Sequence, residues 1–192
     1  MTILYIGLSL FFGLHAYSAF RSRKAGADIK QKWGEAKYLG LYSLVSLLGF
    51  VAIIWGYSLT QPSAYIFNGV DNGRAFIPWL MVVAVLLLAA SQLPTGFIKK
   101  STRHPMLLAV AVWSVAHLLD GADLPQFALF GSFLVYSLIA LVAVSLRETP
   151  AKNYAQTPYW RNDLFSVLIA FVVYTMLVKG IHEWLFGVTA LV

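Results

Sequence analysis

The residues best suited to chemistry in this sequence are its four histidines. His15, His117 and His182 fall inside apolar stretches, and His104 stands just before a proline where another such stretch begins. An ionisable side chain inside an apolar span is costly unless it is paired or bound, so each of these histidines needs a partner. One interpretation is a hydrogen bond to a neighbouring helix. The other is a ligand site, since neutral imidazole binds iron well. For a single histidine the hydrogen bond is the simpler explanation, whereas three together favour a site.

The residues around two of these histidines support both interpretations. Ser114 is the one small side chain beside His117, whose helical face also holds Trp113, Val110 and Met106. Such a stripe forms either a wall for a flat ligand or ordinary helix packing. His15 shares its face with Leu8, Phe11 and Phe12, which are again either pocket lining or core.

The tetrapeptide TRHP, residues 102–105, predicts the start of a helix. Thr102 is expected to cap it, and a proline suits the first turn. Arg103 and His104 then lie beside exposed backbone amides, where an anion binds well. The alternative is a simple start signal with interfacial positive charge.

The stretch LVKGIHEWLFG, residues 177–187, places two opposite charges inside the last apolar span. Lys179 and Glu183 have the i, i+4 spacing of an ion pair on one helix face. Lys179 is deep enough to need a partner, and the carboxylate of a bound cofactor is the alternative to Glu183.

The composition indicates a membrane protein. Of 192 residues, 59% are hydrophobic and 11% are charged, and the mean hydropathy is +0.73; soluble domains carry roughly 25% charged residues. The chain has no cysteine, which excludes disulfides, Fe–S clusters and thioether-linked haem. The sequence shows neither the histidine and glutamate spacings of zinc or di-iron sites nor a carboxylate in the middle of a span.

Six apolar stretches approach the roughly 20 residues that a helix needs to cross about 30 Å of hydrocarbon. We therefore expect an all-α, polytopic membrane protein, a bundle of about six helices in a single domain, residues 1–192. Residues 61–74, QPSAYIFNGVDNGR, are expected to form an irregular outer loop with a turn at its Asn-Gly pair. The predicted spans are Ile3–Phe20, Tyr38–Thr60, Ala75–Ile98, Pro105–Leu119, Leu124–Leu146 and Leu164 to about Val188.

Positive charge alternates between the loops. The second loop holds one basic residue and the fourth none, so the positive-inside rule places loops one, three and five in the cytoplasm and both termini outside. The net charge of +6 is thus explained by topology, and no nucleic-acid partner is expected. The basic residues are Arg21, Arg23, Lys24, Lys30, Lys32 and Lys37 in loop one, Lys99, Lys100 and Arg103 in loop three, and Arg147, Lys152 and Arg161 in loop five.

Four stretches resemble the NnrU family of membrane proteins: LFFGLHAYSAF, YLGLYSLVSLLGFVAIIWGY, RHPMLLAVAVWSVAHLLDGAD and IHEWLFGV. The resemblance implies a multi-pass protein of the bacterial inner membrane, encoded beside denitrification genes. It also implies a relation to the plant zeta-carotene isomerase, which is a b-type haem enzyme. By motif, the implied ligands of a non-covalent haem b are His15 and His117, with His182 as the rival because its depth is closer to that of His117. Arg103, His104 and Lys179 are the candidate polar contacts of the cofactor.

The resemblance leaves the activity open between two haem functions. One is cis–trans isomerisation of a hydrophobic polyene, and the other is an accessory role in nitric oxide metabolism that binds a diatomic gas. The "RHP" motif also resembles membrane methyltransferases of the isoprenylcysteine carboxyl type, which use S-adenosylmethionine; Arg147 and Glu148 are a weak counterpart of their second motif. A non-catalytic membrane scaffold is the third hypothesis. Beyond membrane lipid, the sequence specifies neither a partner nor an oligomeric state.

Overall fold

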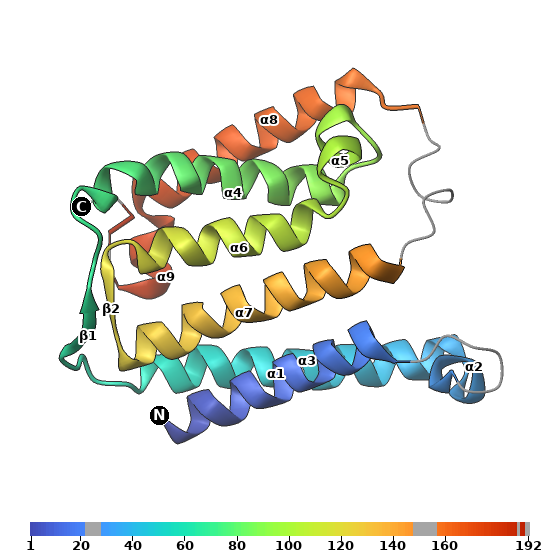
Figure 1. Cartoon of the computed structure of the whole chain (residues 1–192), viewed down its shortest axis with the longest axis horizontal. Coiled ribbons are helices and arrows are strands. Elements are labelled where there is room, and N and C mark those ends of the chain that lie inside the picture. The colour runs from blue at the N-terminus through green and yellow to red at the C-terminus, as the bar shows by residue number, and fades with distance from the viewer. Residues whose placement is uncertain (22–27, 148–156, 188, 191–192) are drawn as a thin grey trace.

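The computed structural model describes residues 1–21, 28–147, 157–187 and 189–190 of an almost entirely helical chain (Figure 1). Five helical segments are long and apolar enough to cross a membrane, and a sixth, α6, is apolar but shorter. The predicted polytopic all-α fold is therefore confirmed. The elements are α1 (Thr2–Phe20), α2 (Ile29–Trp33), α3 (Glu35–Ser58), β1 (Tyr65–Asn68), η1 (Gly73–Phe76), α4 (Ile77–Gln92), α5 (Phe97–Thr102), α6 (Pro105–Leu118), β2 (Gly121–Asp123), α7 (Leu124–Arg147), α8 (Trp160–Met176), η2 (Leu177–Ile181) and α9 (His182–Phe186).

The long helices do not pack in chain order. In Figure 1 they lie side by side as α8, α4, α6, α7 and α1, and α3 packs against α1. Helix α7 therefore bridges the N-terminal pair α1–α3 and the group of α4, α6 and α8. This position makes α7 the common neighbour of the helices that carry His15 and His117.

The α1–α3 contact depends on glycine. A Cβ atom at Gly7 would lie 2.6 Å from the backbone nitrogen of Ile53, and one at Gly56 would collide with the backbone of Leu4. In membranes, small residues of this kind let two helix backbones approach closely. Leu4, Leu8 and Ile53 then form a buried apolar cluster, so Leu8 belongs to the core rather than to a pocket at His15.

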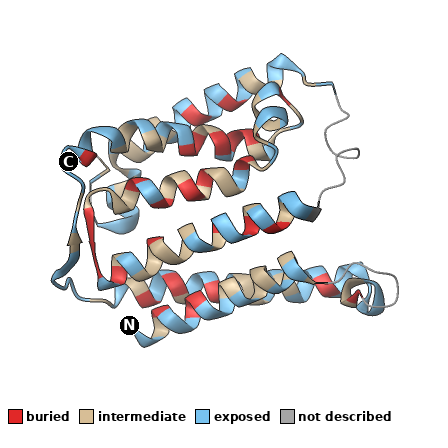
Figure 2. Ribbon diagram, in the orientation of Figure 1, coloured by how far each residue is buried: buried red, intermediate tan, exposed pale blue. Residues whose placement is uncertain are grey.

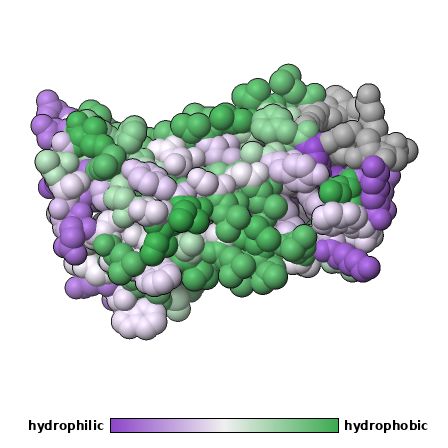
Figure 3. Space-filling model, turned by 90° about the horizontal axis from the view of Figure 1, so that it is seen from below, coloured by the Kyte–Doolittle hydropathy of each residue, from purple (hydrophilic) through white to green (hydrophobic). Residues whose placement is uncertain are grey.

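The ends of the helical layer are polar and its middle is apolar. Figure 3 shows a hydrophobic band across one face with hydrophilic residues at both ends, and Figure 2 shows many exposed residues along the helices.

Helices α2 and α5 lie at one end of the helical layer, opposite the N-terminus and the strands (Figure 1). The described basic residues of loops one and three thus share an end, as predicted, while the side of the membrane that this end faces stays a prediction. Arg23, Lys24, Glu148, Lys152 and Val188 lie outside the described residues.

The third predicted span, Ala75–Ile98, is wrong at its C-terminal end. Helix α4 stops at Gln92, and Leu93 is extended (φ −91°, ψ 162°). A residue before proline disfavours the helical conformation, and Pro94 follows. The chain then forms the separate short helix α5.

Two charged side chains hold α5 in place. The ammonium group of Lys99 donates hydrogen bonds to the carbonyls of Ser91 (2.9 Å) and Leu93 (2.7 Å), which are orphan groups at the end of α4. The carboxylate of Asp163 on α8 accepts hydrogen bonds from the backbone N–H groups of Phe97 (2.7 Å) and Ile98 (3.0 Å). These charges satisfy helix ends, so they serve structure at the interface.

The outer loop, residues 61–74, is not wholly irregular as expected. Its residues Tyr65–Asn68 form β1, which pairs antiparallel with β2 directly after α6. Tyr, Ile and Phe favour strands, and the turn that follows α6 supplies the second edge. Asn72 adopts the left-handed conformation (φ 59°), as its Asn-Gly turn predicts.

The two acidic residues around β2 are also structural. Asp120 pairs with Arg74. Asp123 exchanges hydrogen bonds with Gln126 in a capping box at the start of α7.

Candidate functional site

His117 lies in the last turn of α6 with one ring nitrogen already committed. Its Nδ1 donates a hydrogen bond to the carbonyl of Trp113 (2.9 Å), since a carbonyl only accepts. The imidazole stacks on Phe130 of α7, with ring centroids 4.4 Å apart and planes inclined by 20°. Fixing Nδ1 in this way orients the ring and leaves Nε2 without a protein partner, an arrangement that metal-binding histidines also use.

His15 has the same local geometry on α1. Its Nδ1 donates to the carbonyl of Phe11 (2.7 Å), and its ring stacks on Phe11 at 4.1 Å. Its other ring neighbours are Tyr42 on α3 (5.4 Å) and Tyr136 on α7 (5.9 Å). Within the described residues, neither His15 nor His117 bonds to another helix, so the predicted interhelical hydrogen bond is wrong for both.

Helix α7 separates the two rings. His117 stacks on Phe130 and His15 contacts Tyr136, six residues further along, which is ~9 Å along the helix axis. Between these levels, Phe133 contacts Phe11 of α1 at 5.9 Å and Trp113 of α6 at 5.4 Å. One iron shared by His15 and His117 needs their nitrogens about 4 Å apart, since a metal–imidazole bond is about 2 Å. The described residues show no ring contact between His15 and His117, and their joint ligation stays a prediction.

His182 follows a kink in the last span. Gly180 inside η2 has φ 128° and ψ −14°, which breaks the regular helix between α8 and α9. His182, the first residue of α9, is within electrostatic range of His117 and contacts the ring of Phe186 at 5.0 Å.

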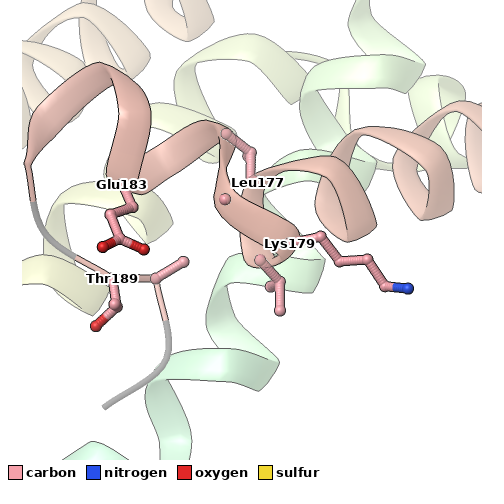
Figure 4. A pocket seen from close by; sticks show the side chains of 7 residues that line it. Leu177, Lys179, Glu183 and Thr189 are labelled. Carbon is pink, nitrogen blue, oxygen red and sulfur yellow. The ribbon is translucent and has the colours of Figure 1, made fainter.

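The same kink separates Lys179 from Glu183. In Figure 4 the two side chains point in different directions, and the described part of the chain contains no ion pair between them. The expected i, i+4 pair is therefore wrong, because Gly180 interrupts the helical geometry on which that spacing depends. Both side chains are exposed and border a small cavity of about 180 Å³. A role for Lys179 at a cofactor stays a prediction.

Arg103 and His104 lie at the opposite end of α6 from His117. Thirteen residues separate His104 from His117, which is ~20 Å along a helix. Pro105 begins α6 as predicted, but the helix has no side-chain cap, because Thr102 is the last residue of α5 and donates to the carbonyl of Ile98. Arg103 between the helices has φ 59°. These residues belong to the corner between α5 and α6, and their contact with an anion or a cofactor stays a prediction.

Comparison with known proteins identifies the family. A family model described as NnrU protein matches residues 3–190. The chain belongs to the NnrU family. No curated protein and no solved structure matches the chain. The family match spans α1, α6 and α9 and so includes all three histidines of the apolar spans.

The surroundings of His117 fit a haem of the kind that the NnrU resemblance implies. Ser114, one turn before His117, is fully buried, and its hydroxyl has no hydrogen-bond partner in the described structure. An unpaired buried hydroxyl costs about 1–3 kcal/mol, so this position favours a polar partner. No group of three or more metal-ligating side chains is found among the described residues. Two imidazoles suffice for an iron that a porphyrin already holds.

Sequence reasoning missed the side chains of α7 and the tyrosines. Phe130 contacts His117, Tyr136 contacts His15, and Phe133 between them contacts Phe11 and Trp113, but their helix carries no histidine. Tyr42 was also missed. A usable signal was present, since Phe130, Phe133 and Tyr136 recur at the spacing of one helix face.

Proposed function

We propose that the protein is a membrane haem b protein in which His117 is one axial ligand and His182 is the other. The observation that carries the proposal is the fixed imidazole of His117, whose Nε2 is left for a ligand. His182 lies within electrostatic range of this ring. Family membership supports the assignment, because the NnrU resemblance implies haem b. His15, which the same resemblance implies as a ligand, is the alternative partner of His117.

The chain's own residues supply orientation and an apolar environment. The Trp113 carbonyl holds the Nδ1 proton and so sets the tautomer of His117. Phe130 covers one face of the imidazole, and the Ser114 hydroxyl provides a buried donor one turn away. A bound haem supplies an iron that takes up a diatomic gas or acts on a polyene. Both activities fit the resemblance. We place the protein in the bacterial inner membrane, with the end that holds α2 and α5 facing the cytoplasm.

The test is the absorption spectrum of the detergent-purified protein, supplied with haem, before and after dithionite reduction. We expect a Soret band and sharp reduced bands in the wild type. His117→Ala and His182→Ala are expected to lose the low-spin spectrum, whereas the control His104→Ala keeps it, because His104 lies at the other end of α6.

Two other outcomes are informative. Loss of the low-spin spectrum in His15→Ala, with His182→Ala unchanged, makes His15 the second ligand. Absence of a Soret band in the wild type, even with haem supplied, contradicts the proposal and leaves the scaffold and methyltransferase hypotheses.

A further inference from the structure

The last span is broken at the point where it reaches a membrane interface. Helix α8 has 17 residues and so covers ~26 Å, close to the hydrocarbon thickness of about 30 Å. Lys179 and Gly180 follow in η2, where Gly180 interrupts the helix. In Figure 1, α9 lies at the end of the layer that also holds the N-terminus and the strands. Lys179 is therefore near the interface at this end.

The interruption lines a cavity. Irregular backbone at membrane depth is tolerated where it is buried in protein or lines a cavity. Here Leu177–Gly180, on one side of the kink, and Glu183 and Thr189, after it, border a cavity of about 180 Å³. One water needs only about 10–15 Å³ on this scale. The cavity therefore has room for a small polar group of several atoms.

Two opposite and unpaired charges border this cavity. Among the described residues, the ammonium of Lys179 and the carboxylate of Glu183 form neither an ion pair nor a hydrogen bond. In Figure 4 the Glu183 and Thr189 side chains lie together, while the Lys179 side chain points the other way. Charged groups next to hydrocarbon are costly unless they are paired. A ligand that carries both an anionic and a cationic group pairs with both side chains.

The surroundings of the cavity select a lipid over a water-soluble zwitterion. The residues next to the kink include Met176, Ile181 and Leu185, which are 53%, 41% and 53% exposed. Such exposed apolar surface at an interface is covered by acyl chains in a membrane. A ligand at this position thus has a charged headgroup in the cavity and apolar chains beside it.

We propose that the cavity at the Gly180 kink binds the headgroup of phosphatidylethanolamine. The phosphate accepts hydrogen bonds from the Lys179 ammonium, whose flexible stem lets it turn toward the cavity. The primary ammonium of the lipid donates to the Glu183 carboxylate and the Thr189 hydroxyl. Phosphatidylcholine has no N–H group to donate to Glu183, and phosphatidylglycerol has no positive charge. The site is separate from the proposed haem ligation and does not depend on it.

The test is native mass spectrometry of the detergent-purified full chain, titrated with phosphatidylethanolamine, phosphatidylcholine or phosphatidylglycerol that carry the same two oleoyl chains. We expect phosphatidylethanolamine to bind the wild type about tenfold more tightly than the other two, because only it forms both charge-assisted contacts. Glu183→Gln is expected to remove this preference. Lys179→Gln is expected to weaken all three lipids, whereas Lys179→Arg keeps the charge and the binding.

Asp71→Asn is the matched control for Glu183→Gln. Asp71 is an exposed carboxylate in the loop after β1 and lies outside this cavity, so its replacement is expected to leave the lipid preference unchanged. The replaced side chains are exposed, and an unchanged Tm in lipid-free detergent shows that the variants fold.

Three results overturn the lipid site. The first is equal affinity of the wild type for the three lipids, and the second is a preference that survives in Glu183→Gln. The third is loss of the Soret band in Lys179→Gln, which assigns the ammonium group to the cofactor. Failure of the haem proposal is distinct, since it appears as a colourless wild type and leaves the lipid titration unaffected.

Discussion

His15 and His117 have the same backbone arrangement and very different neighbours. Each ring donates Nδ1 to the carbonyl four residues before it and contacts an aromatic side chain at that position. His117 then faces the apolar ring of Phe130 and lies near a second histidine, whereas His15 is bordered by tyrosines from two helices. The comparison shows that a local motif sets the ring's orientation and the neighbouring helices set its chemistry.

The largest expected effect separates the two histidines. In His117→Ala we expect haem to be lost, whereas His15→Ala is expected to keep it, because the proposed axial ligands are His117 and His182. Haem content is measured from the absorption spectrum of each purified variant. Loss of haem in both variants shows that the two histidines serve a single site.

The second prediction concerns the α1–α3 contact. In Gly56→Leu the added side chain collides with the backbone of Leu4, and overpacking of this kind costs about 1–3 kcal/mol. We expect lower thermal stability, with the haem spectrum retained. Gly13→Leu is the control, since a Cβ at Gly13 meets no atom within 4 Å. Equal destabilisation in both variants contradicts the predicted close approach.

The third prediction concerns the kink that precedes His182. Gly180→Ala puts a side chain at φ 128°, which costs about 1–3 kcal/mol or straightens the helix. Either result moves His182, so the haem-to-protein ratio is expected to fall. Gly40→Ala on α3, where a Cβ has open space, is the control. An unchanged haem ratio in Gly180→Ala excludes a requirement for the kink.

The smallest expected effect is the pH dependence of the pair at the polar end of α1. The Arg21 guanidinium bonded to Asp28 lowers the pKa of that carboxyl from its usual value. A lowered folded pKa stabilises the protein above the unfolded pKa of about 3.9, and this stabilisation disappears as the pH falls below it. We expect Asp28→Asn to have a lower Tm than the wild type at pH 7, with the difference shrinking below about pH 4. A difference that is independent of pH contradicts a role for the Asp28 charge.

Composition and periodicity alone determined that this is a polytopic helical membrane protein, because about 20 uncharged residues have few alternatives to a membrane helix. Pro94 and Gly180 interrupt two of those helices through local backbone conformation, and the signal for each was present in the sequence. Which histidine meets which partner was decided only by the tertiary structure. The chain packs α7 between α1 and α6, so Tyr136 meets His15 from a helix that is distant in sequence, whereas Phe130 meets His117 from the next long helix. Spacing along one chain specifies a helix face, but contacts between helices depend on how those faces pack in three dimensions.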